Sequence, residues 1–334
     1  MSRNIVVCCD GTGNEYGKKN TNVVEVYKTL DLEYPEKQIA YYDPGVGTMG
    51  DPALSTGVGK TVNKGLGLAF GRGMTRNMED AYRYIMNSYR KGDRLFLFGF
   101  SRGAYTARAL AGMIHKMGLL KKGSENLIPY ALKLYKKHPE TPDEWRIVNG
   151  FKKTFARPCK VHFMGVWDTV KSVGWFRRRV TLDFTMNNPS IRYGRHAVAI
   201  DEKRSQYRTN LWGSKNRSDF REVWFAGVHS DVGGSYEENG LSNVSLKWML
   251  DAARSYGMII DEDKLAAIIP DPMGKMHNPL TPFWWLLGWA KRKVRTMCRE
   301  EGAMVWVHSS VKVRQEGDPK YKPAIPDDAV FVEG

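Results

Sequence analysis

The 334-residue sequence contains only four cysteines, and their spacing argues against two kinds of site. Cys8 and Cys9 are adjacent within a strand pattern, whereas Cys159 and Cys298 lie far along the chain. Zinc sites use cysteines in pairs a few residues apart, and disulfide frameworks pack many cysteines into a short chain. We therefore interpret the four residues as reduced, mostly buried thiols.

The sequence also lacks a hydrophobic run long enough to cross a bilayer. The longest apolar stretch near the C-terminus, PFWWLLGWA at 282–290, is far shorter than the roughly 20 residues that a crossing needs. The first ten residues, MSRNIVVCCD, enter a strand pattern without the apolar region and cleavage site of a secretory signal. We expect a cytoplasmic protein without a transmembrane segment. Secretion by a route that needs no such signal stays open.

Acidic residues are scarce relative to basic ones. The chain has 36 acidic and 51 basic residues, which gives a formal net charge of +15. This excess favours anionic partners such as phospholipid headgroups or an acidic protein, although a solvated basic surface explains it equally well. We do not expect nucleic acid to be the partner.

Familiar cofactor motifs are missing as well. No His-Glu-x-x-His occurs, and the glycines near the N-terminus form neither a complete dinucleotide fingerprint nor a Gly-Lys-Ser/Thr phosphate loop. We expect no cofactor and no metal. Three carboxylates, Asp10, Asp168 and Asp231, together with His229, leave a metal-dependent hydrolase as an alternative.

Apolar runs alternate with helical patterns along most of the chain. Because the predicted strands are apolar almost throughout, they indicate a mainly parallel central sheet with helices on both faces. The predicted strands are 4–10, 38–42, 94–100, 159–166 and 222–228, and the predicted helices are 73–89, 102–116, 121–156 and 242–256. We assign the α/β class and an α/β-hydrolase-like domain over residues 1–334. It has inserted cap segments at 44–72, 120–156 and 176–220 and a C-terminal extension at 258–334.

One segment, LFLFGFSRGAYTAR at 95–108, places Ser101 between Gly99 and Gly103 at the end of a predicted strand. This Gly-x-Ser-x-Gly pattern is typical of a nucleophile elbow, in which a sharp turn from strand to helix exposes the serine hydroxyl. The glycines allow the strand and the helix to pass close together. The pattern predicts Ser101 as a nucleophile.

A serine hydroxyl needs a base to activate it and an acid to orient that base. In α/β-hydrolases the chain order is serine, then acid, then histidine. Asp168 and His229 fit this order, and each follows a predicted strand. His308, which follows a short apolar run at 304–307, is the rival base, and Asp231 and Asp10 are rival acids.

The developing oxyanion of an acyl transfer needs two backbone donors. One is usually the N–H of the residue after the nucleophile, here Arg102, and the other comes from a neighbouring loop. The loop after the first strand offers Gly11 or Thr12. We expect Asp10 to hold that loop in shape, although an ordinary Asp-Gly turn gives the same pattern.

Four blocks of sequence together resemble a known family. They are CCDGTGN at 8–14, GFSRGAYTAR at 99–108, GVWDTV at 165–170 and FAGVHSDVGGSY at 225–236. The chain resembles the DUF2235 family of α/β-hydrolases, which is similar to the catalytic domain of the Tle1-class type VI secretion phospholipase effectors. The resemblance implies Ser101 as nucleophile, Asp168 as acid and His229 as base, with a phospholipid or other acyl ester as substrate.

Residues 283–295 place tryptophans beside lysines and arginines. Such a mixture suits peripheral contact with an anionic membrane, and it equally suits a core-packed helix with a basic end. The sequence therefore predicts a serine ester hydrolase that acts through an acyl-enzyme. A catalytically silent module that binds an anionic partner and a metal-dependent hydrolase are the alternatives.

Overall fold

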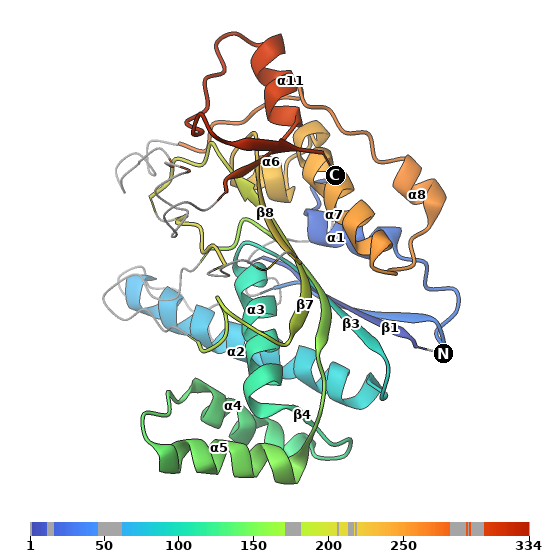
Figure 1. Cartoon of the computed structure of the whole chain (residues 1–334), viewed down its shortest axis with the longest axis vertical. Helices are drawn as coiled ribbons and strands as arrows, with labels where there is room; N and C mark the ends of the chain where they lie inside the picture. Colours follow the sequence, from blue (N-terminus) through green and yellow to red (C-terminus); the bar gives the residue numbers. More distant parts are fainter. Residues whose placement is uncertain are drawn as a thin grey trace.

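The computed structural model describes residues 2–11, 17–45, 62–170, 182–205, 207–212, 217, 219–280, 292, 294 and 304–333, with backbone only for 62–72. Its centre is an eight-stranded sheet in the order β10-β9-β8-β7-β6-β3-β1-β2 (Figure 1). All neighbouring strands in this sheet run parallel. The strands are β1 (Asn4–Cys9), β2 (Gln38–Asp43), β3 (Arg94–Phe100), β6 (Val161–Trp167), β7 (Ile191–Ala199), β8 (Phe220–Phe225), β9 (Trp306–His308) and β10 (Val330–Val332).

Helices cover both faces of the sheet, as Figure 1 shows. One face carries α2 (Val62–Ser88), α3 (Arg102–Met117), α4 (Ile128–Lys136) and α5 (Pro142–Phe155), and the other carries α1 (Asn22–Thr29), α7 (Gly240–Ser255) and α8 (Glu262–Ala266). The smaller elements are η2 (Glu125–Leu127), α6 (His229–Gly233), α11 (Ser310–Gly317) and the antiparallel pair β4 (Leu119–Leu120) and β5 (Ala156–Arg157). Every residue of β1 is buried, as a strand covered on both faces requires. The predicted fold class is confirmed.

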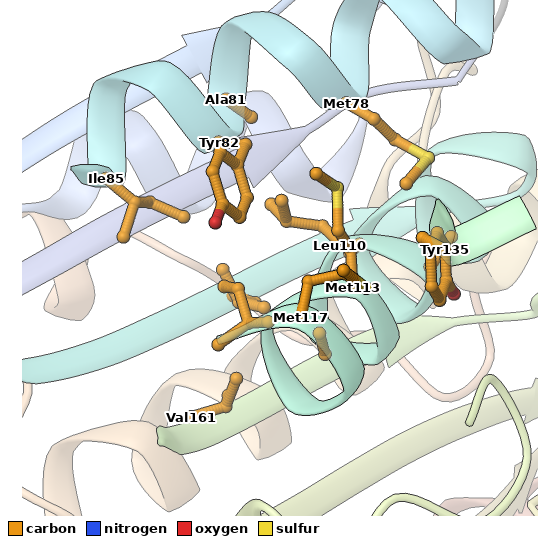
Figure 2. Packing of buried hydrophobic residues seen from close by; sticks show 14 of the residues in the cluster. Met78, Ala81, Tyr82, Ile85, Leu110, Met113, Met117, Tyr135 and Val161 are labelled. Atoms are coloured by element: carbon orange, nitrogen blue, oxygen red, sulfur yellow. The ribbon is translucent and has the colours of Figure 1, made fainter. Parts of the chain in front are cut away.

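The larger core lies between α2, α3 and the sheet. Figure 2 shows Met78 and Ile85 of α2 on the side that faces Leu110 and Met113 of α3, all of them fully buried. Tyr82 lies in the same layer, where its hydroxyl donates to the Gly118 carbonyl at 2.8 Å and accepts from the Leu120 N–H at 2.9 Å. This packing fixes α3, the helix that follows Ser101, against the sheet.

The chain order changes direction between β1 and β3. From β1 the chain crosses to the edge strand β2 and then returns to β3 on the opposite side of β1. At such a switch point the loops after the two central strands separate, and ligands of open parallel sheets bind there, outside the carboxyl ends of the strands. Asp10 and Ser101 directly follow these two strands.

The central sheet includes strands from two segments that the sequence analysis treated as an insertion and an extension. The expected insertion at 176–220 contains β7, which lies between β6 and β8. Its first half carries the exposed Arg192 and the partly buried Arg195, so the apolar pattern is broken where the strand begins. The expected C-terminal extension at 258–334 supplies β9 and β10.

The other expected insertions differ in how much of them is described. Within 120–156, α4 and α5 pack on the larger core through Ile128, Val148 and other buried side chains. The insertion expected at 44–72 lies mostly outside the described residues. Residues 283–295 also lie outside them, except for Arg292 and the buried Val294. Within the described residues, no helix combines the length and the apolar character that crossing a bilayer needs.

Candidate functional site

Ser101 lies at the turn from β3 into α3 with φ 58° and ψ −120°. A positive φ is strained for a residue that carries a Cβ, and this strain is typical of a nucleophile elbow. A Cβ added to Gly99 would lie 2.6 Å from the Gly103 carbonyl oxygen, and one added to Gly103 would lie 2.2 Å from the Cys9 carbonyl oxygen. The two glycines therefore allow the end of β1, the end of β3 and the start of α3 to meet at one point.

The backbone of Ser101 is bonded to the end of the neighbouring strand β6. Its N–H donates to the Trp167 carbonyl at 3.1 Å, and its carbonyl accepts from the Val170 N–H at 3.3 Å. Asp168 lies between these two partners and also has a positive φ, 32°. The serine and the carboxylate thus occupy two adjacent strand ends whose relative position is held by backbone hydrogen bonds.

His229 is the first residue of α6, directly after the turn that follows β8. Its Nδ1 lies 2.6 Å from Asp168 Oδ2, and both side chains are almost completely buried. The imidazole also packs on the ring of Phe100, the residue before Ser101, with ring centroids 4.5 Å apart. Among the described residues, none forms a hydrogen bond with His229 Nε2 or with the Ser101 hydroxyl.

Asp168 is surrounded by donors. Besides the His229 bond, its Oδ1 accepts from Thr209 Oγ1 at 2.9 Å and from the Ala199 N–H at 3.2 Å. Arg292 reaches both carboxylate oxygens, with Nη1–Oδ1 at 2.6 Å and Nη2–Oδ2 at 3.0 Å. Burial alone would raise the pKa of Asp168, but Arg292 and His229 hold it well below its ordinary value. The carboxylate is therefore ionised at any physiological pH.

His229 has a second acidic neighbour. Its backbone N–H donates to Glu202 Oε2 at 3.2 Å, and Arg204 in turn pairs with both oxygens of Glu202, at 2.9 Å and 2.8 Å. The Tyr207 ring meets the imidazole edge-on at a centroid distance of 4.9 Å. Burial lowers the pKa of His229, and the bond to Asp168 opposes this shift only in part. The imidazole is thus neutral near pH 7 and able to accept a proton.

The residues expected to support the oxyanion differ in their contacts. Asp10 accepts from the Gly11 N–H at 2.6 Å, from Thr21 Oγ1 at 2.7 Å and from the Tyr42 hydroxyl at 2.8 Å. Asp10 therefore holds the loop after β1. The Gly11 N–H, which the sequence offered as a donor to the oxyanion, donates to the Asp10 side chain in this structure. Thr12 lies outside the described residues. Arg102 is the first residue of α3 and directly follows Ser101.

The rival residues lie in other environments. His308 stacks on Phe225, and its Nδ1 is 2.8 Å from the Ser310 hydroxyl, while burial lowers its pKa to about 4. Asp231 binds the Val228 N–H at 3.0 Å and pairs with His277 Nδ1 at 2.7 Å. Neither rival contacts Asp168 or His229 through a hydrogen bond. Over the described ranges, no three histidine, cysteine or acidic side chains gather in a way that could hold a metal ion.

Sequence reasoning missed Arg292 and Glu202. Arg292 stands in the basic run KRKVR at 291–295, where nothing distinguishes it from its neighbours, and its partner lies 124 residues earlier. Glu202 follows strand β7, which the sequence did not predict. Its one available signal was its place just after an apolar run, AVAI at 197–200.

Known proteins match this chain in both sequence and fold. The family model of the Tle1-like type VI secretion phospholipase effector catalytic domain matches residues 3–252. An uncharacterized protein of Saccharomyces cerevisiae, YEL023C, is 36% identical over 219 residues, which are 62% of this chain and 32% of the yeast protein. The match thus spans about a third of the length of that relative.

Two solved structures match this chain over most of its length. The Tle1 effector bound to the VgrG spike of the type VI secretion system matches with a TM-score of 0.50 and 15% identity, over 82% of this chain and 77% of the effector. An uncharacterized protein from Pseudomonas aeruginosa matches with a TM-score of 0.49 and 18% identity, over 81% of this chain and 49% of that protein. Because the family model covers well over half of the sequence, this chain belongs to the family of Tle1-like phospholipase effector catalytic domains.

Proposed function

We propose that the protein is a serine ester hydrolase that cleaves a lipid or other acyl ester through an acyl-enzyme. Ser101 is the nucleophile, His229 the general base and Asp168 the residue that orients the imidazole. The observation that carries this proposal is a strained Ser101 at a strand-to-helix turn, next to a buried histidine–aspartate pair. Membership of a phospholipase effector family supports a lipid ester as the substrate class.

In the first half of the reaction, the Ser101 hydroxyl oxygen attacks the acyl carbonyl carbon and His229 Nε2 takes the hydroxyl proton. Asp168 Oδ2, 2.6 Å from Nδ1, keeps that nitrogen protonated and stabilises the imidazolium that forms. The backbone N–H of Arg102 and a donor from the loop after Asp10 stabilise the oxyanion. Collapse of the tetrahedral intermediate breaks the ester bond, and His229 returns the proton to the leaving alcohol.

In the second half, water attacks the acyl-enzyme. His229 takes a proton from the water, the ester to Ser101 breaks, and the proton returns to the serine oxygen, which releases the fatty acid. Peripheral contact with an anionic membrane through the basic surface and residues 283–295 remains a prediction.

The proposal is tested by ester hydrolysis with purified wild-type protein and Ser101→Ala, using p-nitrophenyl butyrate and vesicles of phosphatidylglycerol and phosphatidylcholine. Ser255→Ala, on the exposed end of α7, is the matched control. We expect release of nitrophenol and fatty acid by the wild type and the control, and a loss of about 10⁴-fold or more in Ser101→Ala. Full turnover by Ser101→Ala would refute the proposal.

The same assay separates the two alternatives. A metal-dependent hydrolase would lose its activity in chelator and keep it in Ser101→Ala. A catalytically silent binding module would hydrolyse none of the esters and would still bind the anionic vesicles. We expect turnover that chelator does not change, since within the described residues no group of metal-ligating side chains forms around His229.

A further inference from the structure

Arg292 is a buried cation that lies beyond the part of the chain matched by the family model. It is 7% exposed, and it follows the matched region, residues 3–252, by 40 positions (292 minus 252). Its contacts nevertheless lead into that region, to the carboxylate of Asp168 and to the carbonyls of Ala199 and Tyr207.

We infer that Arg292 is a positioning residue of the proposed triad: it holds the Asp168 carboxylate in place for His229 and weakens the attraction between that carboxylate and the imidazolium. The inference rests on the proposed function. It also means that the C-terminal part of the chain completes an active site whose other members lie within residues 3–252.

The two terminal nitrogens of the Arg292 guanidinium form a fork that four hydrogen bonds hold in place. Nη1 donates to Asp168 Oδ1 at 2.6 Å and to the Ala199 carbonyl at 2.8 Å, and Nη2 donates to Asp168 Oδ2 at 3.0 Å and to the Tyr207 carbonyl at 2.5 Å. Each of the four hydrogens on the two terminal nitrogens thus has one acceptor. A planar guanidinium matches a carboxylate in this two-point manner, whereas a lysine ammonium does not. The fork fixes the plane of the carboxylate, including the oxygen that His229 uses.

The charges around His229 form two pairs. Asp168 faces the imidazole Nδ1 and is paired with Arg292, and Glu202 faces the backbone N–H and is paired with Arg204. In the part of the chain that the structure describes, the further titratable neighbour is Tyr207, whose ring lies edge-on to the imidazole. Each carboxylate that would draw a proton onto His229 therefore has its own arginine. The result is an imidazole that stays unprotonated, and so usable as a base, at a lower pH than an aspartate alone would permit.

Three variants separate charge from geometry. Arg292→Met removes both, Arg292→Lys keeps the charge and loses the fork, and Thr209→Val removes a neutral donor from the same oxygen of Asp168. We expect Arg292→Met to move the acid limb of kcat/KM upward by about one pH unit and to lower kcat about tenfold, with KM unchanged. Arg292→Lys should lower kcat while leaving the acid limb at the wild-type pH. Thr209→Val should also leave the limb in place.

A second measurement does not depend on turnover. The titration of His229 is followed by NMR of protein labelled with ¹⁵N-histidine, in the Ser101→Ala background, where Arg292→Met should raise the midpoint by the same amount. A folded Arg292→Met protein with unchanged midpoint and unchanged limb would overturn the inference. If Arg292→Met does not fold, Arg292→Lys decides, because wild-type kcat in that variant would contradict the need for the fork. Esterase activity in Ser101→Ala itself would instead refute the proposed function, and the His229 titration would still test Arg292.

Discussion

Two buried histidine–carboxylate pairs lie in neighbouring parts of this sheet, and they look alike at first. His229 Nδ1 is 2.6 Å from Asp168, and His196 Nδ1 is 2.7 Å from Glu222. Both imidazoles are almost completely buried, at 4% and 0% exposure. Pair geometry alone therefore does not distinguish a candidate catalytic base from a structural histidine.

The two pairs differ in the hydrogen bonding of the second ring nitrogen, Nε2. His196 Nε2 accepts a hydrogen bond from the Thr169 N–H at 3.2 Å, and Glu222 also accepts from the Trp212 N–H. Both members of this pair are therefore bonded to further groups. His196 lies within β7, whereas His229 follows a strand, at the carboxyl edge where parallel sheets bind ligands. Within the described residues, His229 Nε2 has no hydrogen-bond partner. A base needs a ring nitrogen that is not already bonded, and of these two pairs the His229 pair has one among the described residues.

Among the variants that distinguish the two pairs, His229→Gln should lower kcat the most. Loss of the base should lower kcat for p-nitrophenyl butyrate by about 10⁴-fold or more, because serine attack then proceeds without proton removal. Adding Ser101→Ala to His229→Gln should cost little more, since residues that act as a unit are not additive. A fully additive double variant would argue that the two residues act separately.

Asp168→Asn should have the next largest effect. The amide keeps the shape of the side chain, but it no longer holds the imidazole in the correct tautomer, and kcat should fall about 10³- to 10⁴-fold. Circular dichroism and thermal unfolding would check that the protein stays folded. Activity within tenfold of wild type would mean that His229 does not depend on this carboxylate.

The pH dependence of kcat/KM should show a smaller effect. Burial lowers the pKa of His229 below the usual 6.5, and a general base works only when it is unprotonated. Activity should therefore rise with pH through a midpoint below 6.5 and stay level from there to pH 8. A midpoint clearly above 6.5 in the wild type would contradict the charge arrangement around His229.

The smallest effect on turnover is expected for His196→Phe. Its ring nitrogens are already bonded to Glu222 and to the Thr169 N–H, so kcat should stay within about tenfold of wild type. Stability should fall instead, by about 1–3 kcal/mol, because buried polar groups lose their partners. Urea unfolding measures the loss. A drop in kcat as large as that of His229→Gln would break the distinction between the two pairs.

How much of this site can be predicted from sequence depends on how local each signal is. Ser101, Gly99 and Gly103 form a short local motif, and the two glycines are needed because the backbone passes close to each of them. The turn was therefore predictable. Asp168 and His229 were predictable as polar residues that follow apolar strands. The bond between them was not, because strand order is set by long-range packing.

The residues that escaped prediction depend on contacts distant in the sequence. Arg292 contacts Asp168 across 124 positions, and its basic neighbours in sequence hide it. Strand β7 was missed because its first half is partly exposed and carries arginines, which breaks the apolar run that marks a buried strand. The bond from the Gly11 N–H to the Asp10 side chain was not predicted either, because Asp10 was expected to play only a general supporting role in that loop.

Covalent labelling is the most direct test of whether Ser101 is a nucleophile activated by His229 and Asp168. Wild-type protein is treated with a fluorophosphonate probe, digested and mapped by mass spectrometry, alongside His229→Gln and Ser101→Ala. We predict one adduct on the peptide that contains Ser101, a much slower reaction in His229→Gln and none in Ser101→Ala. No adduct at Ser101 in folded wild-type protein, or equal labelling rates in wild type and His229→Gln, would contradict the account.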